Sequence, residues 1–340
     1  MLADFARCFS AGPGYLNTAT LGLPPHEAIE ALRRSLIDWE HGRCEPVAFD
    51  ACVDRSRTAY AAIAGTQAGS VAIVGQVSVA TALVASSLPN GARVLCAEED
   101  FTSMLYPFLT DRRLRVEVAP LAQIVERIVP DVDLVAVSAV QSSDGRVIDL
   151  DDLVAAASAA NARTYIDVTQ GAGWLPIEAS RFDVTSCAAY KWLCCPRGVG
   201  FITVGGDADW LTPLYPGWYA GDDPWQSLYG PVMQLAPDAR KFDVSPAWFD
   251  VVAAAPALEL IAATGVARLR EHSVGIANHF RQLIEMPVSD SAIVSASTTA
   301  AHHLAPSGIT AATRAGRARL SFYGYNTQAD AELAAAALTR

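Results

Sequence analysis

The chain has 340 residues, of which 51% are hydrophobic and 18% are charged, and its formal net charge at pH 7 is −11. This composition argues against disorder and predicts a substantial core, enough for one large domain and one small domain. No block of lysine or arginine is present, so we expect no nucleic-acid partner.

The seven cysteines are odd in number and irregularly spaced, which is typical of neither a disulfide framework nor a zinc site. The first residues lack the apolar stretch of a secretory signal, and no apolar run reaches the ~20 residues that span a bilayer. We therefore expect a cytoplasmic protein with no metal and no membrane association.

Apolar runs of strand length alternate with alanine-rich stretches of helical composition. In chain order, we expect a strand at 71–74, a helix at 78–88, strands at 92–97, 114–118 and 134–138, a helix at 150–160, and strands at 164–167, 183–186 and 200–204. Strands that are apolar throughout and are joined by helices favour a mostly parallel α/β sheet covered on both faces.

The second half of the chain opens with an irregular stretch. Residues 210–248 are rich in Trp, Tyr, Pro, Gly and Asp and show no periodicity, and a long stretch of this kind is usually functional. Its aromatic residues would line a substrate pocket or a subunit interface; they include Trp218, Tyr219 and Trp225. A helix is expected at 248–263, followed by a smaller α+β unit that ends in a strand at 318–322 and a helix from Thr327.

These elements predict three parts of the chain. They are an N-terminal segment that packs on the cleft (1–25), a large domain (26–263) and a small C-terminal domain (264–340).

Two ionisable residues follow expected strands, at the edge where α/β sheets bind ligands. Asp167 ends one strand, and Lys191 follows the next strand 24 residues later. A pyridoxal 5'-phosphate (PLP) enzyme needs such a pair. The lysine amine forms a Schiff base with the aldehyde, and the carboxylate keeps the pyridine nitrogen protonated. The pair alone is weak support, because both residue types are common at strand ends.

Four motifs carry a more specific signal. They are residues 15–22 (YLNTATLG), 167–171 (DVTQG), 190–200 (YKWLCCPRGVG), and 319–321 followed by 325–327 (RLS and YNT). In this order and spacing they resemble the class V aminotransferases, the cysteine-desulfurase-like and kynureninase-like branch of the fold-type I PLP-dependent enzymes. The resemblance covers nearly the whole chain. It implies PLP as cofactor and a fold-type I α/β architecture, with a large domain built on a mostly parallel sheet and a smaller C-terminal α+β domain.

The resemblance also implies roles for single residues. Lys191 would be the Schiff-base lysine and the proton shuttle at the substrate Cα, and Asp167 would pair with the pyridine nitrogen. Gln170 would hydrogen-bond the phenolic oxygen of the cofactor. Arg319 would hold the substrate carboxylate through a planar bidentate pair, with Asn17 also in the substrate site.

The remaining expected cofactor contacts are Gln76, Val77, Ser78, Phe101, Ser142 and Tyr190. The first three lie between a strand and a helix, where backbone N–H groups suit a phosphate. That signal is modest, because a Gly–x–x–Ser turn ordinarily only starts a helix. Tyr190 would add a phosphate hydrogen bond, Phe101 would stack on the cofactor ring, and Ser142 would contact the cofactor oxygen.

Two departures from the family pattern bear on the reaction. Desulfurases carry a catalytic cysteine in the stretch that reads AAHHLAP here, at 300–306, so desulfurase chemistry of the usual kind is disfavoured. Cys194 and Cys195 stand close to Lys191 and are expected to pack, with a reactive thiol left open. The family's phosphate contact from the partner subunit is also altered, since the segment 240–246 reads RKFDVSP here, but the likeness of the segment implies a homodimer with active sites near the interface.

The sequence thus predicts a PLP-dependent enzyme that acts at the Cα of an amino acid, with aminotransfer as the preferred reaction. A β-lyase that cleaves a C–S or C–C bond, or an epimerase, stays open, because the sequence does not fix which bond lies perpendicular to the ring. A non-catalytic binding protein with the PLP fold is the alternative of another class. The presence of Lys191, Asp167 and Arg319 together argues against it.

Overall fold

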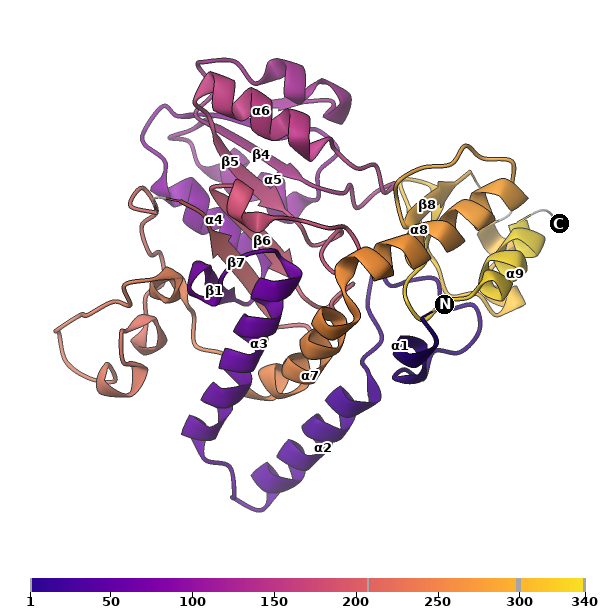
Figure 1. Cartoon of the computed structure of the whole chain (residues 1–340). Helices are drawn as coiled ribbons and strands as arrows, with labels where there is room; N and C mark the ends of the chain where they lie inside the picture. Colours follow the sequence, from indigo (N-terminus) through magenta and orange to yellow (C-terminus); the bar gives the residue numbers. More distant parts are fainter. Residues whose placement is uncertain (1, 207, 298–300, 339–340) are drawn as a thin grey trace.

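The fold was analysed in a computed structural model that describes residues 2–206, 208–297 and 301–338. Figure 1 shows a large body built on one sheet and a smaller body, formed by the C-terminal part of the chain, beside it. The predicted fold class is confirmed: the molecule is α/β, with a mostly parallel seven-stranded sheet and a separate three-stranded sheet.

The strands of the large sheet are β1 (Val71–Val74), β2 (Arg93–Ala97), β3 (Arg115–Ala119), β4 (Leu134–Ser138), β5 (Arg163–Asp167), β6 (Val184–Ala188) and β7 (Gly200–Val204). The helices up to residue 264 are α1 (Ala3–Arg7), α2 (His26–Glu40), α3 (Asp50–Ile63), α4 (Val77–Ser87), α5 (Thr102–Thr110), α6 (Leu150–Ala160) and α7 (Trp248–Thr264). The small body contains α8 (Val266–Leu283), β8 (Ile293–Ala296), β9 (Ala312–Arg314), β10 (Arg317–Ser321) and α9 (Gln328–Leu338).

The large sheet has the strand order β1-β7-β6-β5-β4-β2-β3, and only β7 runs antiparallel to its neighbours. β1, β4, β6 and β7 are buried along their whole length. Apolar side chains on both faces of these strands require a helical layer on each side, which explains why the sequence alternates between the two kinds of element.

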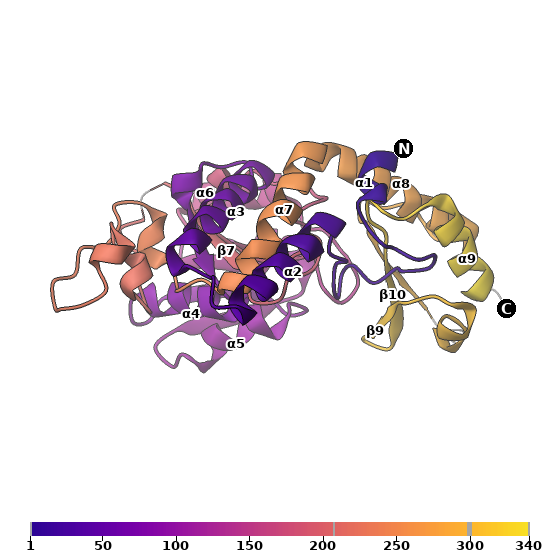
Figure 2. The same cartoon turned by 90° about the horizontal axis from the view of Figure 1, so that it is seen from below.

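Helices cover both faces of the sheet. Figure 2 shows α4 and α5 on one face and α3, α6 and α7 on the other. The buried side chains accordingly form two clusters in the large body, one between the sheet and α4 and α5, the other between the sheet and α3, α6 and α7. The carboxyl ends of β4, β5 and β6 stay uncovered by these layers and are free to carry a site.

The small body packs α8 and α9 on the sheet β8-β10-β9, around a third buried cluster. The chain enters it at Gly265, whose φ of 88° separates α7 from α8. Among the described residues, no single helix is long and apolar enough to cross a membrane. Only α7 and α8 together pass that test of length and composition, and they are bent by 82° relative to each other.

The N-terminal segment joins the two bodies. Tyr15 and Asn17 form parallel bridges with Thr310 and Ser321 in the small body. Further along, the Gly22 N–H donates to the Tyr190 carbonyl over 2.9 Å. A Cβ at Gly22 would lie 1.9 Å from the Lys191 carbonyl oxygen, so the close approach requires glycine.

The irregular stretch after β7 contains only short turns and packs away from the sheet edge described above. Tyr219 and Trp225 both donate hydrogen bonds to the Asp50 carboxylate, over 2.9 and 2.7 Å. Near the end of the stretch, the buried Asp243 carboxylate accepts from the Arg57 guanidinium and from the Ile73 N–H, each over 2.7 Å. These contacts fix the stretch to α3 and β1.

Candidate active site

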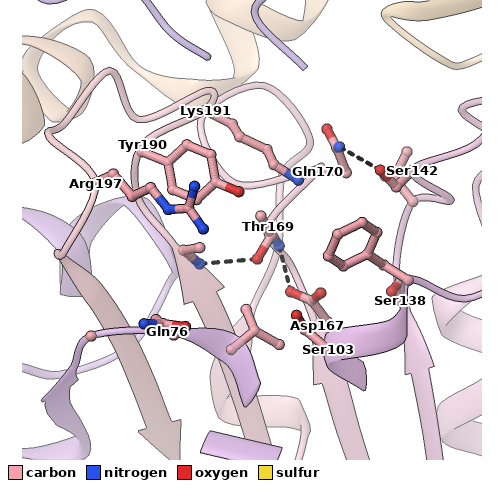
Figure 3. Close-up of a pocket in the computed structure, with 15 residues that line it drawn as sticks. Gln76, Ser103, Ser138, Ser142, Asp167, Thr169, Gln170, Tyr190, Lys191 and Arg197 are labelled. Carbon is pink, nitrogen blue, oxygen red and sulfur yellow. Dashed lines mark hydrogen bonds between the residues drawn. The ribbon is translucent and has the colours of Figure 1, made fainter. Parts of the chain in front are cut away.

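A pocket lies at the carboxyl ends of β4, β5 and β6, beside the start of α4. Its lining residues are Gly75, Gln76, Val77, Phe101, Ser103, Ser138, Val140, Ser142, Asp167, Thr169, Gln170, Ala188, Tyr190, Lys191 and Arg197. Figure 3 shows Lys191, Tyr190 and Arg197 along one side of it, and Asp167 and Ser103 on the side across from them. Eight of the eleven site residues expected from the sequence therefore line one cavity.

Asp167 is the last residue of β5 and is buried. The Thr169 N–H donates to its Oδ1 over 2.9 Å, and the Thr169 Oγ1 accepts from the Ala188 N–H over 2.9 Å, which fixes the turn after the strand. Burial raises the pKa of Asp167, while the Thr169 hydrogen bonds and the Lys191 charge oppose that rise. The carboxylate is held in one orientation facing the cavity.

Lys191 follows β6 and is 7% exposed. Burial lowers its pKa to about 8, with the Asp167 charge opposing and the Arg319 charge adding to the effect. Its Nζ lies 5.5 Å from the centre of the Phe101 ring and 5.7 Å from that of Tyr190. An amine with this pKa is in part neutral near physiological pH, the form that attacks a carbonyl.

One end of the pocket is built for an anion. α4 begins at Val77, and its N-cap residue Gln76 makes no side-chain cap hydrogen bond, so the first N–H groups of the helix are left for a ligand. The Arg197 guanidinium lies 5.5 Å from the centre of the Tyr190 ring, and within the described part of the chain no carboxylate is in ion-pair distance of it. Arg197 was not assigned from the sequence, although it stands in the lysine motif.

Arg319 comes from β10, approaches the pocket behind Ser142 and is only 2% exposed. Its guanidinium donates to the Ser142 carbonyl and hydroxyl and, over 2.6 Å, to the Thr20 hydroxyl. Gln170 donates to the same Ser142 hydroxyl over 3.1 Å and to the Ala19 carbonyl over 3.0 Å. No described carboxylate pairs with Arg319, so a buried positive charge is left without a counter-ion.

Phe101 precedes α5 and is 50% exposed, so its ring is open to a ligand in the pocket. The preceding residue, Asp100, is buried, and its carboxylate accepts from the Ser138 N–H and from the Gln141 amide over 2.7 Å. Burial raises the pKa of Asp100 to about 7. These contacts fix the loop that carries Phe101, and no pattern in the sequence predicts them.

Three expected site residues are not among those that line the cavity. Ser78 lies one residue inside α4, Asn17 bridges to Ser321, and Arg319 approaches behind Ser142. Cys194 and Cys195 lie in the lysine loop with buried side chains, and burial raises the pKa of both thiols.

The stretch 300–306 is described except for Ala300, which lies outside the described residues. His302 and His303 lie in a short turn, and Leu304 is buried. Across the described residues, no group of three or more His, Cys, Asp or Glu side chains is arranged to hold a metal ion.

A family model for class V aminotransferases matches residues 77–287, which include the pocket and Lys191. The chain belongs to the class V aminotransferase family. Its curated relatives include an uncharacterized aminotransferase of Bacillus subtilis, YcbU, which is 30% identical over 64% of this chain, and a kynureninase of Deinococcus radiodurans, 29% identical over 80% of it. The matches span 60% and 71% of the lengths of those two proteins.

Solved structures of the same fold cover this class V chain almost completely. The cysteine desulfurase CsdA of Escherichia coli aligns with a TM-score of 0.83 and 18% identity, over 100% of this chain and 98% of its own. The cystine C–S lyase C-DES aligns with a TM-score of 0.85 and 18% identity, over 96% and 97%. At this level of identity they establish the fold alone.

The lowered pKa of Lys191 can be measured directly, because the chain has only two lysines, Lys191 and Lys241. With ¹³Cε-lysine labelling, NMR titration of the cofactor-free protein should give a midpoint near pH 8 for Lys191, against 10.5 for an ordinary lysine. A carboxylate favours an ammonium and a guanidinium disfavours it, so Asp167→Asn should lower the midpoint and Arg319→Gln should raise it. Lys241→Arg assigns the two signals. A midpoint that neither variant moves would contradict this account.

Proposed function

We propose that this protein is a PLP-dependent enzyme that acts at the Cα of an amino acid, and that its reaction is aminotransfer. The observation that carries the proposal is the buried pair of Lys191 and Asp167, which face one cavity between an aromatic ring and an anion-binding end. Membership of the class V aminotransferase family supports it.

The polarity of the pocket fits PLP. The Asp167 carboxylate lies at one end, and the start of α4 with Arg197 lies at the other, which suits a ring with a basic nitrogen on one side and a phosphate on another. Phe101 and Lys191 border the space between them. When bound, PLP supplies an electron-withdrawing ring that stabilises negative charge at the substrate Cα.

The residues of the chain then have separate tasks. Asp167 holds a proton at the pyridine nitrogen, since an ionised carboxylate favours the charged form of its partner. Lys191 would take the proton from the substrate Cα and return a proton to the cofactor carbon. Burial lowers the pKa of Arg319 to about 10, so its guanidinium stays charged at neutral pH and can bind the substrate carboxylate.

A PLP-dependent β-lyase is the second candidate. It is favoured by the relatives, which include a cysteine desulfurase of Frankia and a protein of Aeropyrum pernix named as a probable cysteine desulfurase, and by the C–S lyase among the solved structures. If this protein is a lyase, it works without a cysteine thiol in the 300–306 loop, because that stretch reads AAHHLAP. An epimerase uses the same groups and stays an alternative; a relative carries the name isopenicillin N epimerase.

The reaction type can be assigned with the purified holoenzyme. We expect PLP to give a visible absorbance band that Lys191→Ala abolishes, and borohydride to fix the cofactor on the peptide that contains Lys191. Amino acids should then convert the cofactor to its amine form with one equivalent of oxo acid released and no ammonia. Release of pyruvate and ammonia with the visible band retained would assign a lyase instead. A wild-type protein that binds no PLP would overturn the proposal.

Arg197 is expected to bind the phosphate group. Charge-assisted hydrogen bonds contribute about 1.5–3 kcal/mol, so Arg197→Met should weaken PLP binding by roughly tenfold to a hundredfold or more. Pyridoxal, which lacks the phosphate, should bind the variant and the wild type equally. Fluorescence titration with the two ligands measures both effects.

The matched control for this experiment is Arg163→Met. Arg163 also stacks on an aromatic ring, that of Trp210, at 4.7 Å, but it lies at the start of β5, far along the strand from Asp167. We expect its substitution to leave the ratio of PLP to pyridoxal affinity unchanged. An Arg197 variant with the wild-type ratio would remove the phosphate role and leave the rest of the proposal in place.

We also propose that the protein is a homodimer with active sites near the interface. An apolar stretch of the irregular segment supports the dimer itself: Tyr229, Val232 and Met233 are 93%, 78% and 69% exposed. It extends from the large body in Figures 1 and 2. Such side chains in one exposed stretch favour contact with another protein surface.

Charged substitutions should separate the subunits. Val232→Asp with Met233→Asp places two carboxylates in the apolar stretch, and a buried charge without a partner is strongly unfavourable. Sedimentation should give twice the chain mass of 36.0 kDa for the wild type and the single mass for the double variant. Val288→Asp is the control, because Val288 is 64% exposed on the small body. A wild-type protein at 36.0 kDa would contradict the dimer.

A further inference from the structure

The hairpin that carries Arg319 presents a second arginine on the same face. In the antiparallel register of β9 and β10, Arg319 pairs with Ala312 and Arg317 pairs with Arg314. Side chains alternate between the two faces of a strand, so Arg314 shares the face of Arg319 and is its diagonal neighbour, at about 7–8 Å. The tight turn between the strands, with φ of 47° at Ala315, fixes this register.

The three arginines of this face differ in their partners. The Arg317 guanidinium donates to the Ser295 hydroxyl and carbonyl over 3.0 and 2.9 Å, and is therefore engaged. Among the described residues, Arg314 donates only to the carbonyl of its neighbour Thr313. Considering the described residues only, neither Arg314 nor Arg319 has a carboxylate in ion-pair distance. Two guanidinium groups without a carboxylate partner thus lie on one face of the hairpin, and that of Arg319 lies next to the site.

The charge of Arg314 acts on the active site itself. It lowers the pKa of Arg319 after the larger effect of burial, and it lowers the pKa of Lys191 after the larger effects of burial, Asp167, Arg319 and Cys187. Arg314 does not itself line the pocket, but its charge is close enough to act on both the lysine and Arg319.

Assigning each charged residue of the site to a partner leaves Arg314 without one. If the proposed function holds, the cofactor phosphate takes Arg197 and the substrate α-carboxylate takes Arg319. Asp167 is the only carboxylate among the residues that line the pocket, and it is assigned to the pyridine nitrogen. Arg314 then remains as a cation that neither the protein nor the α-carboxylate neutralises.

We propose that Arg314 binds a second acidic group on the substrate, so that the enzyme acts on dicarboxylic α-amino acids. The proposal rests on the proposed function, because it assigns the side-chain end of the substrate that Arg319 holds by its α-carboxylate. Arg314 is then a specificity-determining residue: it selects substrates with a distal carboxylate and leaves the chemistry at Cα to Lys191 and Asp167. A guanidinium recognises a carboxylate through two parallel hydrogen bonds, which neutral side chains cannot form.

The test uses the PLP-loaded protein and simple acids as probes. Calorimetric titration compares succinate and glutarate with butyrate and valerate, which lack the second carboxylate. We expect the wild type to bind the better dicarboxylate at least about tenfold more tightly than its monocarboxylate, a difference of ~1.4 kcal/mol. Arg314→Gln should remove this preference and keep the monocarboxylate affinity. Arg319→Gln should weaken both classes of acid.

Arg317→Gln is the matched control, because Arg317 pairs with Arg314 across the hairpin but is engaged by Ser295. Arg317→Gln should keep the wild-type preference for dicarboxylates. If it lost as much of that preference as Arg314→Gln, the preference would come from the general surface charge, and the proposal would be overturned.

Steady-state kinetics adds a second readout. Arg314→Gln should raise the KM for L-aspartate or L-glutamate about tenfold, with little change for L-asparagine or L-glutamine. A wild type that binds PLP and shows no dicarboxylate preference would overturn this proposal alone. A wild type without bound PLP would overturn the proposed function instead.

Discussion

The site depends on keeping one positive and one negative charge together at a buried sheet edge. Removing Lys191 and Asp167 from water is costly, and each partly compensates the other, as the opposing effects on their pKa values show. The surrounding hydrogen bonds keep this arrangement in place. Thr169 fixes the carboxylate, and its hydroxyl accepts from the Ala188 N–H near the end of β6, the strand that leads to the lysine. An ordered turn after each strand is therefore part of the electrostatics of the site.

The N-terminal segment closes the site by bringing distant parts of the chain into contact. Its Ala19 carbonyl accepts from Gln170, its Thr20 hydroxyl accepts from Arg319, and its Gly22 backbone meets the lysine loop. Gln170 belongs to the large body and Arg319 to the small body. The N-terminal segment therefore fixes the two side chains relative to each other. Shifting it would move Arg319, the proposed carboxylate-binding residue, relative to Lys191. Small displacements of this kind are costly to a reaction that requires aligned groups.

The sequence predicted the parts of the site that strand order determines. Strands that are apolar throughout indicated the parallel sheet, and Asp167 and Lys191 were assigned from their place at strand ends together with the family motifs around them. Asp100 and Arg197 could not be assigned in the same way, because their roles depend on what lies across the pocket. The packing of the irregular segment was equally unpredictable. It rests on Asp50 with Trp225, 175 residues apart, and no periodic pattern records such a contact.

The charges of Arg314 and Arg319 would link substrate binding to the basicity of Lys191, the proposed catalytic base. The charges of Arg319 and Arg314 lower the pKa of Lys191. A carboxylate bound to either guanidinium would offset that charge, and the pKa of the free lysine amine would then rise. Lys191 would thus be a weak base while the site is empty and a stronger one when a substrate carboxylate is in place, which is when it has a proton to take from Cα. The residues that recognise the substrate would therefore also prepare the base for its reaction.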